Sequence, residues 1–80
     1  MKNTNALSEL DPGGRARVLD ILADDGLRRR LQDLGLIRET EVSCVRKSPL
    51  GDPVAYLIRG AVIALRREDA SCVQIRCCEG

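Results

Sequence analysis

The stretch TEVSCVRKSPLGDPVAYLIRGAVIAL, residues 40–65, decides the fold because it holds three short β-forming runs separated by turn residues. Thr40 to Lys47 is predicted to be the first strand, with Val45 among its apolar members. Residues 48–53 read as a loop, since their two prolines cannot donate to a β-ladder and their glycine allows positive φ. Val54 to Arg59 and Ala61 to Leu65 follow as two strands, joined by a tight hairpin at the intervening glycine.

Upstream of this stretch, the sequence predicts one more strand and a helix. Arg15 to Ala23 mixes apolar and charged residues with imperfect alternation, which indicates a strand with a bulge. Asp24 offers a carboxylate as a helix N-cap. Three leucines then recur at i, i+4 and i+7, on the face that we expect to pack into the core: Leu27, Leu31 and Leu34. Gly35 stands where a residue in the left-handed region would end the helix.

Downstream, Arg66 to Ala70 is predicted to form a single helical turn, and Ser71 to Arg76 a closing strand. So few short, twisted strands are stable only when the sheet curls onto itself. We therefore expect a mainly β, small α+β fold, with residues 1–80 forming a single domain. Its architecture would be a partly open barrel of about five short strands, with one α-helix packed on it.

The composition argues against an enzyme. Histidine is absent, which removes the commonest general base, and there is neither a GxGxxG nor a Walker A motif. The adjacent carboxylates, Asp24 with Asp25 and Glu68 with Asp69, stand where helices begin, so capping is their simplest role. We expect no catalytic residues.

Nucleic acid and membrane are not expected as partners. The formal net charge is only +1, and the basic cluster Arg28-Arg29-Arg30 has acidic neighbours. Tyr56 is the single aromatic residue, so bases have no platform on which to stack. No stretch reaches the roughly 18 apolar residues of a membrane span, and no signal peptide is recognisable. We expect a cytoplasmic protein.

Four cysteines leave two interpretations open. We expect Cys44 and at least one of the other three cysteines to be small buried apolar side chains, as free cysteines commonly are. Cys72, Cys77 and Cys78 have the spacing C-x4-C-C, which is not a recurrent zinc pattern. The adjacent thiols of Cys77 and Cys78, with Cys72, are the candidate ligands for a soft transition metal ion.

The order of the motifs resembles the ferrous iron transport protein A (FeoA) family over residues 7–76. The matching pieces are RLQDLGL at residues 30–36, SPLGDP at residues 48–53, Gly60, and Ala64-Leu65-Arg66. This resemblance implies a cytoplasmic SH3-like barrel without enzymatic activity. It also implies a partner, the FeoB membrane ferrous iron transporter, which has a cytoplasmic GTP-binding domain. Where the family usually has Pro-Gly-Thr, this chain has Arg38-Glu39-Thr40, so we expect that turn to have a different geometry.

From this resemblance, the leading hypothesis is an accessory or regulatory module that docks on the GTP-binding domain of the transporter. One candidate surface is the loop Leu50-Gly51-Asp52, where an apolar side chain at an exposed tip suggests a contact. The other is the Arg28/Arg29 face of the helix, which would suit an acidic patch. An ordinary solvated loop and helix face are the alternative for both. The alternative function is a metal-responsive domain that uses Cys72, Cys77 and Cys78. An open sheet edge would also allow weak homo-oligomers.

Overall fold

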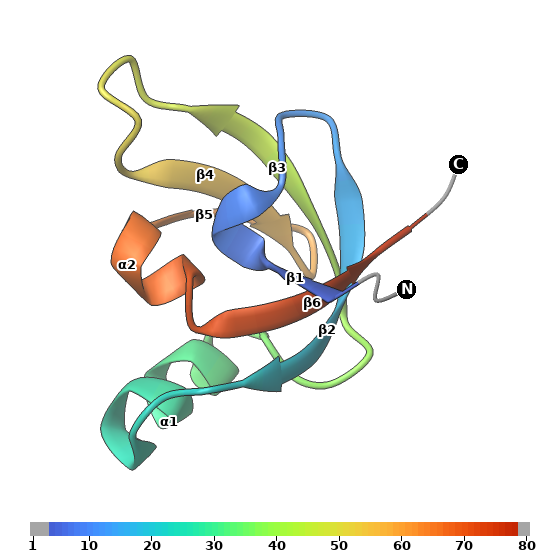
Figure 1. The fold of residues 1–80 in the computed structure, drawn as a ribbon, viewed down its shortest axis with the longest axis vertical. Coiled ribbons are helices and arrows are strands. Elements are labelled where there is room, and N and C mark those ends of the chain that lie inside the picture. Colours follow the sequence, from blue (N-terminus) through green and yellow to red (C-terminus); the bar gives the residue numbers. More distant parts are fainter. Residues whose placement is uncertain (1–3, 79–80) are drawn as a thin grey trace.

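A computed structural model describes residues 4–78, which form one six-stranded sheet with the order β1-β6-β2-β3-β4-β5 (Figure 1). The strands are β1 (Thr4–Ala6), β2 (Arg15–Ile21), β3 (Glu41–Lys47), β4 (Val54–Ile58), β5 (Ala61–Leu65) and β6 (Val73–Cys77). The helices are α1 (Asp25–Asp33), the short α2 (Arg67–Ala70) and a 3-10 turn, η1 (Leu7–Glu9).

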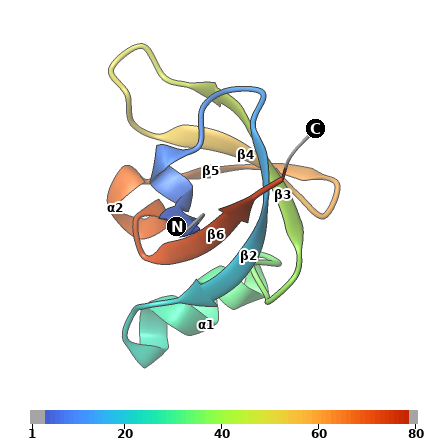
Figure 2. The same ribbon diagram turned by 45° about the vertical axis from the view of Figure 1, so that its right-hand side comes forward.

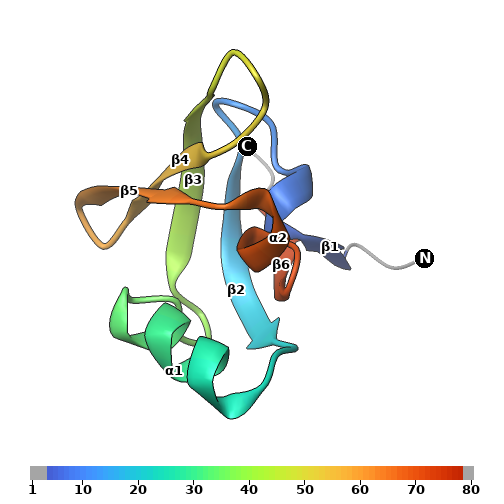
Figure 3. The ribbon, with the colours of Figure 1, turned by 90° about the vertical axis from the view of Figure 1, so that its left-hand side faces the viewer.

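The sheet is strongly coiled but not closed. Every neighbouring pair of strands is antiparallel, and β1 and β5 are its two edges. Seen from the side, β4 and β5 run crosswise to β2 and β3, so that the two halves of the sheet enclose a common interior (Figure 3). Figure 2 shows α2 and η1 beside β6, and α1 below β2. The predicted partly open barrel is therefore confirmed.

The core is almost entirely aliphatic. Among the described residues, every side chain classed as buried is apolar: Leu7, Leu10, Ala16, Val18, Ile21, Leu31, Leu36, Val42, Cys44, Val54, Tyr56, Ile58, Leu65, Ala70, Val73 and Ile75. Tyr56 carries the one polar atom in this interior, and its Oη donates a hydrogen bond to the Leu7 carbonyl at 3.2 Å. This bond joins β4 to η1 across the core and satisfies a hydroxyl whose burial would otherwise cost free energy.

The number of elements differs from the prediction of about five strands and one helix. The additional strand is β1, where Thr4, Asn5 and Ala6 pair with β6, with Asn5 opposite Ile75. This strand has only three residues, which are mostly polar, so no alternation of apolar and polar side chains predicts it. The second helix, α2, is the single turn that was expected at residues 66–70.

Strands β2 and β3 each contain a bulge, and the bulge in β3 turns one side chain towards solvent. The predicted bulge in β2 is confirmed, since its register with β6 shifts between Val18 and Asp20. A second bulge, which the sequence did not indicate, lies in β3 between Cys44 and Arg46. It turns Val45 outward, and that side chain is 45% exposed.

Helix α1 begins and ends as predicted. The Asp24 carboxylate accepts a hydrogen bond from the Leu27 amide at 2.9 Å. At the other end, Gly35 has φ +108° and donates to the Gln32 carbonyl, while Leu36 donates to the Leu31 carbonyl. These two bonds form a Schellman motif and bring the buried Leu36 back onto the helix.

Only part of the leucine face of α1 is buried. Leu31 is in the core, and Leu27 packs against it at the margin. Leu34 is 37% exposed, so its assignment to the core was wrong. The reason is geometric, because the Schellman turn places Leu36, rather than Leu34, against the sheet. Neither α1 nor any other helix in residues 4–78 has the length and apolar content to cross a membrane.

The turn before β3 corrects another expectation. Glu39 has φ +73°, so the position keeps a left-handed conformation although it is not glycine. Its amide donates to the Val18 carbonyl at 2.8 Å, and its carbonyl accepts from Arg17 Nη1 at 3.0 Å. These two backbone contacts tie the turn to β2 and stabilise a conformation that a glutamate rarely adopts.

Candidate docking surface

The loop between β3 and β4 presents one apolar side chain to solvent. Leu50 is 94% exposed at its tip, more than any other exposed large apolar residue in residues 4–78. The loop around it is ordered by short contacts. The Gly51 amide donates to the Ser48 carbonyl at 2.8 Å, which closes a turn with Pro49 at its second position. Ser48 Oγ donates to the Pro53 carbonyl at 2.6 Å.

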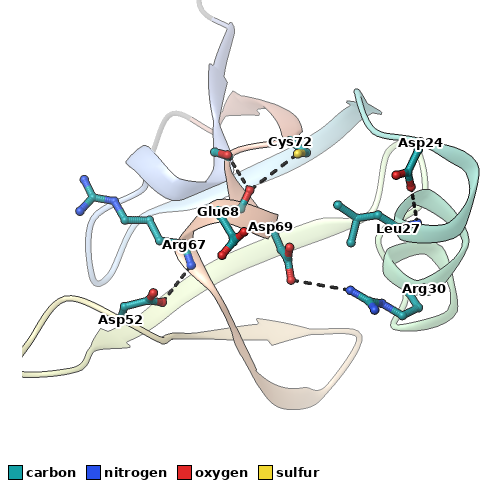
Figure 4. Close-up of polar contacts among 9 residues, drawn as sticks. Asp24, Leu27, Arg30, Asp52, Arg67, Glu68, Asp69 and Cys72 are labelled. Carbon is teal, nitrogen blue, oxygen red and sulfur yellow. Dashed lines mark hydrogen bonds and ion pairs between the residues drawn. The ribbon is translucent and has the colours of Figure 1, made fainter.

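Asp52 attaches this loop to α2. Its Oδ1 accepts a hydrogen bond from the Arg67 amide at 2.9 Å (Figure 4). The carboxylate therefore satisfies one of the free amides at the start of α2. Gly51, with φ +86°, allows the chain to turn. Of the three residues predicted to form the loop surface, Leu50 alone projects away from the molecule, and the other two hold the loop that carries it.

The helix face predicted as a second surface is only partly free. Arg28 Nη2 donates to the Ile21 carbonyl at 3.3 Å and so links α1 to the end of β2. Arg30 Nη2 lies 3.9 Å from Asp69 Oδ2 of α2. Figure 4 draws this ion pair, which is weak because the guanidinium is exposed. Arg29 is exposed, and no ion pair within residues 4–78 includes it.

The two predicted surfaces do not come together. In all three ribbon views, the β3–β4 loop lies at one end of the long axis and α1 at the other (Figures 1–3). A single compact contact would therefore use one of them. The sequence interpretation did not single out the exposed Leu57 and Val62, which lie opposite each other on β4 and β5. The uncharged run of residues 61–65 is the signal that could have identified Val62, and the hairpin register then places Leu57 opposite it.

The cysteines lie in three separate places. Cys44 is buried, as expected, and burial raises the pKa of its thiol. The expectation of a second buried cysteine was wrong, because Cys72 and Cys78 are half-buried and Cys77 is exposed. Cys72 lies before β6, where its Sγ is 3.7 Å from the Glu68 carbonyl (Figure 4). Cys77 and Cys78 lie at the opposite end of β6, about 16 Å away at the usual rise per strand residue. Cys77 Sγ accepts from Asn5 Nδ2 at 3.7 Å.

The predicted metal ligands therefore do not form one site in this chain. Residues 4–78 contain no group of three or more His, Cys, Asp or Glu side chains placed to hold an ion. Cys77 and Cys78 are adjacent in sequence, but a structural zinc site takes four ligands. The donors present in these residues do not fit a complete metal centre.

A cavity of about 340 Å³ lies between the bulge of β2 and the end of α1. Its lining mixes apolar side chains, such as Leu36 and Ile37, with Asp20, Gln32 and Arg38. None of these is a nucleophile held by a general base, which is the arrangement that covalent catalysis needs. The cavity adds no catalytic group to the surface described above.

The coiled sheet, the capping helix and the exposed loop tip define a small SH3-like domain. The chain belongs to the FeoA domain family, which it matches over residues 5–77. An Fe(2+) transport protein A/Fe(2+) transporter FeoB fusion protein of Porphyromonas gingivalis is 33% identical over 69 residues. That match covers 86% of this chain but only 8% of the fusion protein, so the chain corresponds to a small part of that relative.

Solved structures of FeoA proteins have the same fold. The FeoA-like protein of Clostridium acetobutylicum is 29% identical, with a TM-score of 0.90 over 100% of this chain and 93% of its own. FeoA of Stenotrophomonas maltophilia, complexed with zinc, is 34% identical, with a TM-score of 0.78 over 88% and 87% of the two chains. It is described as an SH3 domain protein and a candidate ferrous iron transport activating factor. The predicted family and SH3-like fold are confirmed.

Proposed function

We propose that this chain is a non-enzymatic accessory module of bacterial ferrous iron uptake, acting in the cytoplasm by docking on the GTP-binding domain of a FeoB-type transporter. The observation that carries the proposal is the fusion protein, in which a segment similar to this chain is joined to FeoB. Fusion of two proteins keeps them at a high effective concentration, which benefits proteins that act together.

The loop tip is the contact that best suits this role. Moving an exposed leucine side chain from water into an apolar pocket is favourable, by about 2 kcal/mol for full burial. The hydrogen bonds of Ser48, Gly51 and Asp52 already order the loop, so little further conformational entropy is lost on binding. Leu50 is therefore the proposed anchor, with Gly51 and Asp52 as the residues that position it.

The Arg28/Arg29 face is the alternative proposed contact for this partner, because it lies at the opposite end of the molecule from the loop and one compact contact would use only one of them. Since Arg28 is engaged by the Ile21 carbonyl, Arg29 is the side chain that remains available to an acidic patch. An exposed ion pair between Arg29 and an acidic residue of the partner would affect the association rate and its salt dependence more than the affinity.

The experiment is a titration of the purified chain with the cytoplasmic GTP-binding domain of the transporter from the same organism, followed by calorimetry. Leu50→Asp should weaken binding at least tenfold, because it removes the apolar contact and desolvates a charge. Val62→Asp is the matched control, since Val62 is also exposed but lies on β5, outside both the loop and α1. Equal binding by wild type and Leu50→Asp would exclude the loop, and no binding by wild type would refute the proposed partner.

Metal binding is the second candidate function, favoured by the zinc complex of the Stenotrophomonas relative. In this chain, Cys77 and Cys78 could supply two thiolates, and the remaining ligands would have to come from elsewhere. Zinc content after dialysis tests this function. Replacing both residues by serine should abolish bound zinc, whereas Cys72→Ser, at the other end of β6, should not. Unchanged zinc content in the double variant would exclude these ligands.

A further inference from the structure

The β3–β4 loop shares its base with the end of β5. Val54, which follows the loop, lies opposite Leu65 in the sheet, so β5 ends beside the point where the loop rejoins the sheet. The next residue is Arg66, the N-cap of α2, and the Asp52 carboxylate accepts a hydrogen bond from the Arg67 amide at 2.9 Å (Figure 4). The ends of β3 and β5 and the start of α2 therefore all adjoin the loop with the exposed tip.

Two arginines lie at this base, on the outer face of the sheet. Arg46 is opposite Ala55, and Ala55 is opposite Ala64, so these side chains form a row across β3, β4 and β5. Ala55 stands between two buried residues of β4, so the row faces outward. Arg66 is two residues beyond Ala64 in extended backbone (φ −66°, ψ 144°), which directs it to the same face. We call these four residues the loop-end face, and its two arginines are about 10 Å apart across the strands.

The loop-end face is basic, although the formal net charge of the chain is only +1. Both of its arginines are exposed, and no ion pair within residues 4–78 includes either of them. The carboxylates around the loop are engaged elsewhere. Asp52 is bonded to the start of α2, Asp11 pairs with Lys47 at 3.6 Å, and Glu68 is next to Arg67 in α2. The face itself has two positive charges and no negative one.

A partner that buries Leu50 must also cover the loop-end face. Leu50 is four residues from Arg46, so their Cα atoms are at most about 14 Å apart. On the other side, Asp52 holds the loop against the residue that follows Arg66. A standard protein contact covers about 800 Å² on each partner, which is a patch roughly 30 Å across. Both arginines therefore fall within a contact centred on Leu50.

We infer that the surface of the GTP-binding domain that receives Leu50 is an apolar pocket bordered by carboxylates, which pair with Arg46 and Arg66. The inference rests on the proposed function and adds to it the chemistry of the partner's surface. Carboxylates suit this border because a charged group that loses water without gaining a counter-charge costs free energy. The small alanine side chains between the two arginines leave room for them to approach.

The loop tip and the loop-end face should act on different rate constants. Charges at the rim of a contact mainly raise the association rate and make it depend on salt, whereas burial of an apolar anchor mainly slows dissociation. Charge reversal at Arg46 or Arg66 should therefore lower kon, and truncation of Leu50 should raise koff. Salt should remove only the first effect, because the screening length falls from about 10 Å at 0.1 M to about 3 Å at 1 M.

The test is stopped-flow fluorescence of the full chain with the labelled GTP-binding domain of the transporter from the same organism, at about 0.1 M and about 1 M NaCl. Arg46→Glu and Arg66→Glu should each lower kon about twofold at the lower salt, and the double variant about fivefold. These differences should disappear at the higher salt. Leu50→Ala should raise koff about tenfold at both salt concentrations, with kon unchanged.

Arg38→Glu is the control, because it makes the same change of net charge beside the cavity at the α1 end of the molecule. It should associate at nearly the wild-type rate, and circular dichroism should show that all variants are folded. A folded double variant with wild-type kon at the lower salt would overturn the inference, as would an equal loss of rate in Arg38→Glu. Either result leaves the proposed partner standing, since wild type still binds. A wild type that does not bind would refute the partner and the inference together.

Discussion

Glu39 is the position where a single substitution should make this protein more stable. Its φ of +73° lies in the left-handed region, which costs a residue with a Cβ about 1–2 kcal/mol relative to the right-handed region. Both contacts of Glu39 described above use backbone atoms, so glycine can keep them. Against the gain stands the greater flexibility of glycine in the unfolded chain, roughly 0.5–1 kcal/mol.

Glu39→Gly should therefore raise the free energy of unfolding by about 0.5–1 kcal/mol. For a domain of this size, that corresponds to an increase in Tm of roughly 3–6 °C. Thermal unfolding followed by circular dichroism measures it directly. Arg38→Gly is the matched control, because the neighbouring residue is also exposed but is not among the residues with positive φ.

The control should lower Tm, since it adds flexibility to the unfolded chain without relieving any strain. The reasoning is refuted if Glu39→Gly lowers Tm as well, or if the two variants cannot be distinguished. A lower Tm for Glu39→Gly would mean that the glutamate side chain contributes more than its exposed position indicates.

Two further predictions concern buried groups. Burial raises the pKa of Tyr56 to about 12, so the folded protein should form tyrosinate well above the pH at which the unfolded chain does, near 10.0. The neutral hydroxyl is favoured in the folded state, and its stability contribution is complete below pH 10 and is lost as pH rises towards 12. Near-ultraviolet titration and urea unfolding over this range measure both effects, and ionisation of the folded protein near pH 10 would contradict the burial argument. Cys44 should resist thiol reagents until the protein unfolds, because it is buried and its pKa is raised, whereas the exposed Cys77 should react at once. Mass spectrometry of partly labelled protein distinguishes the two sites, and equal labelling rates would show that Cys44 is accessible.

The fold explains how so small a domain can present a defined contact. The coiled sheet encloses an aliphatic core, and Tyr56 connects that core to η1 through one hydrogen bond. The β3–β4 loop is attached to α2 through Asp52. A partner that binds Leu50 would therefore contact a side chain on a loop that is already ordered by hydrogen bonds. That arrangement suits the accessory role proposed from the fusion with FeoB.

Most elements were predictable because their signals are local. The Asp24 cap, the Gly35 stop and the two-residue hairpin at Gly60 each depend on the conformational preferences of a few neighbouring residues. Strand β1 was missed because three mostly polar residues become a strand only when β6 is there to pair with them. The exposure of Leu34 was missed because the helical period cannot tell how far a helix extends over the sheet.

The candidate surfaces were likewise predictable only in part from the sequence. The sequence alone placed Leu50 in a turn-rich loop, and its exposure follows from the composition of that loop. Only the tertiary structure showed that Asp52 caps α2 and that Arg28 is held by the Ile21 carbonyl. Both contacts depend on where separate elements lie against each other, which no local pattern in the sequence determines.

The sequence by itself thus determined the class of fold and most turns, because apolar periodicity, glycines, prolines and caps act over a few residues, and the order of its motifs indicated the family by resemblance. The tertiary structure decided which strand became the open edge, which side chains remained free and which turn accepted a strained glutamate. Those properties arise when the sheet coils and sets the neighbours of every residue, and no local pattern in the chain records them.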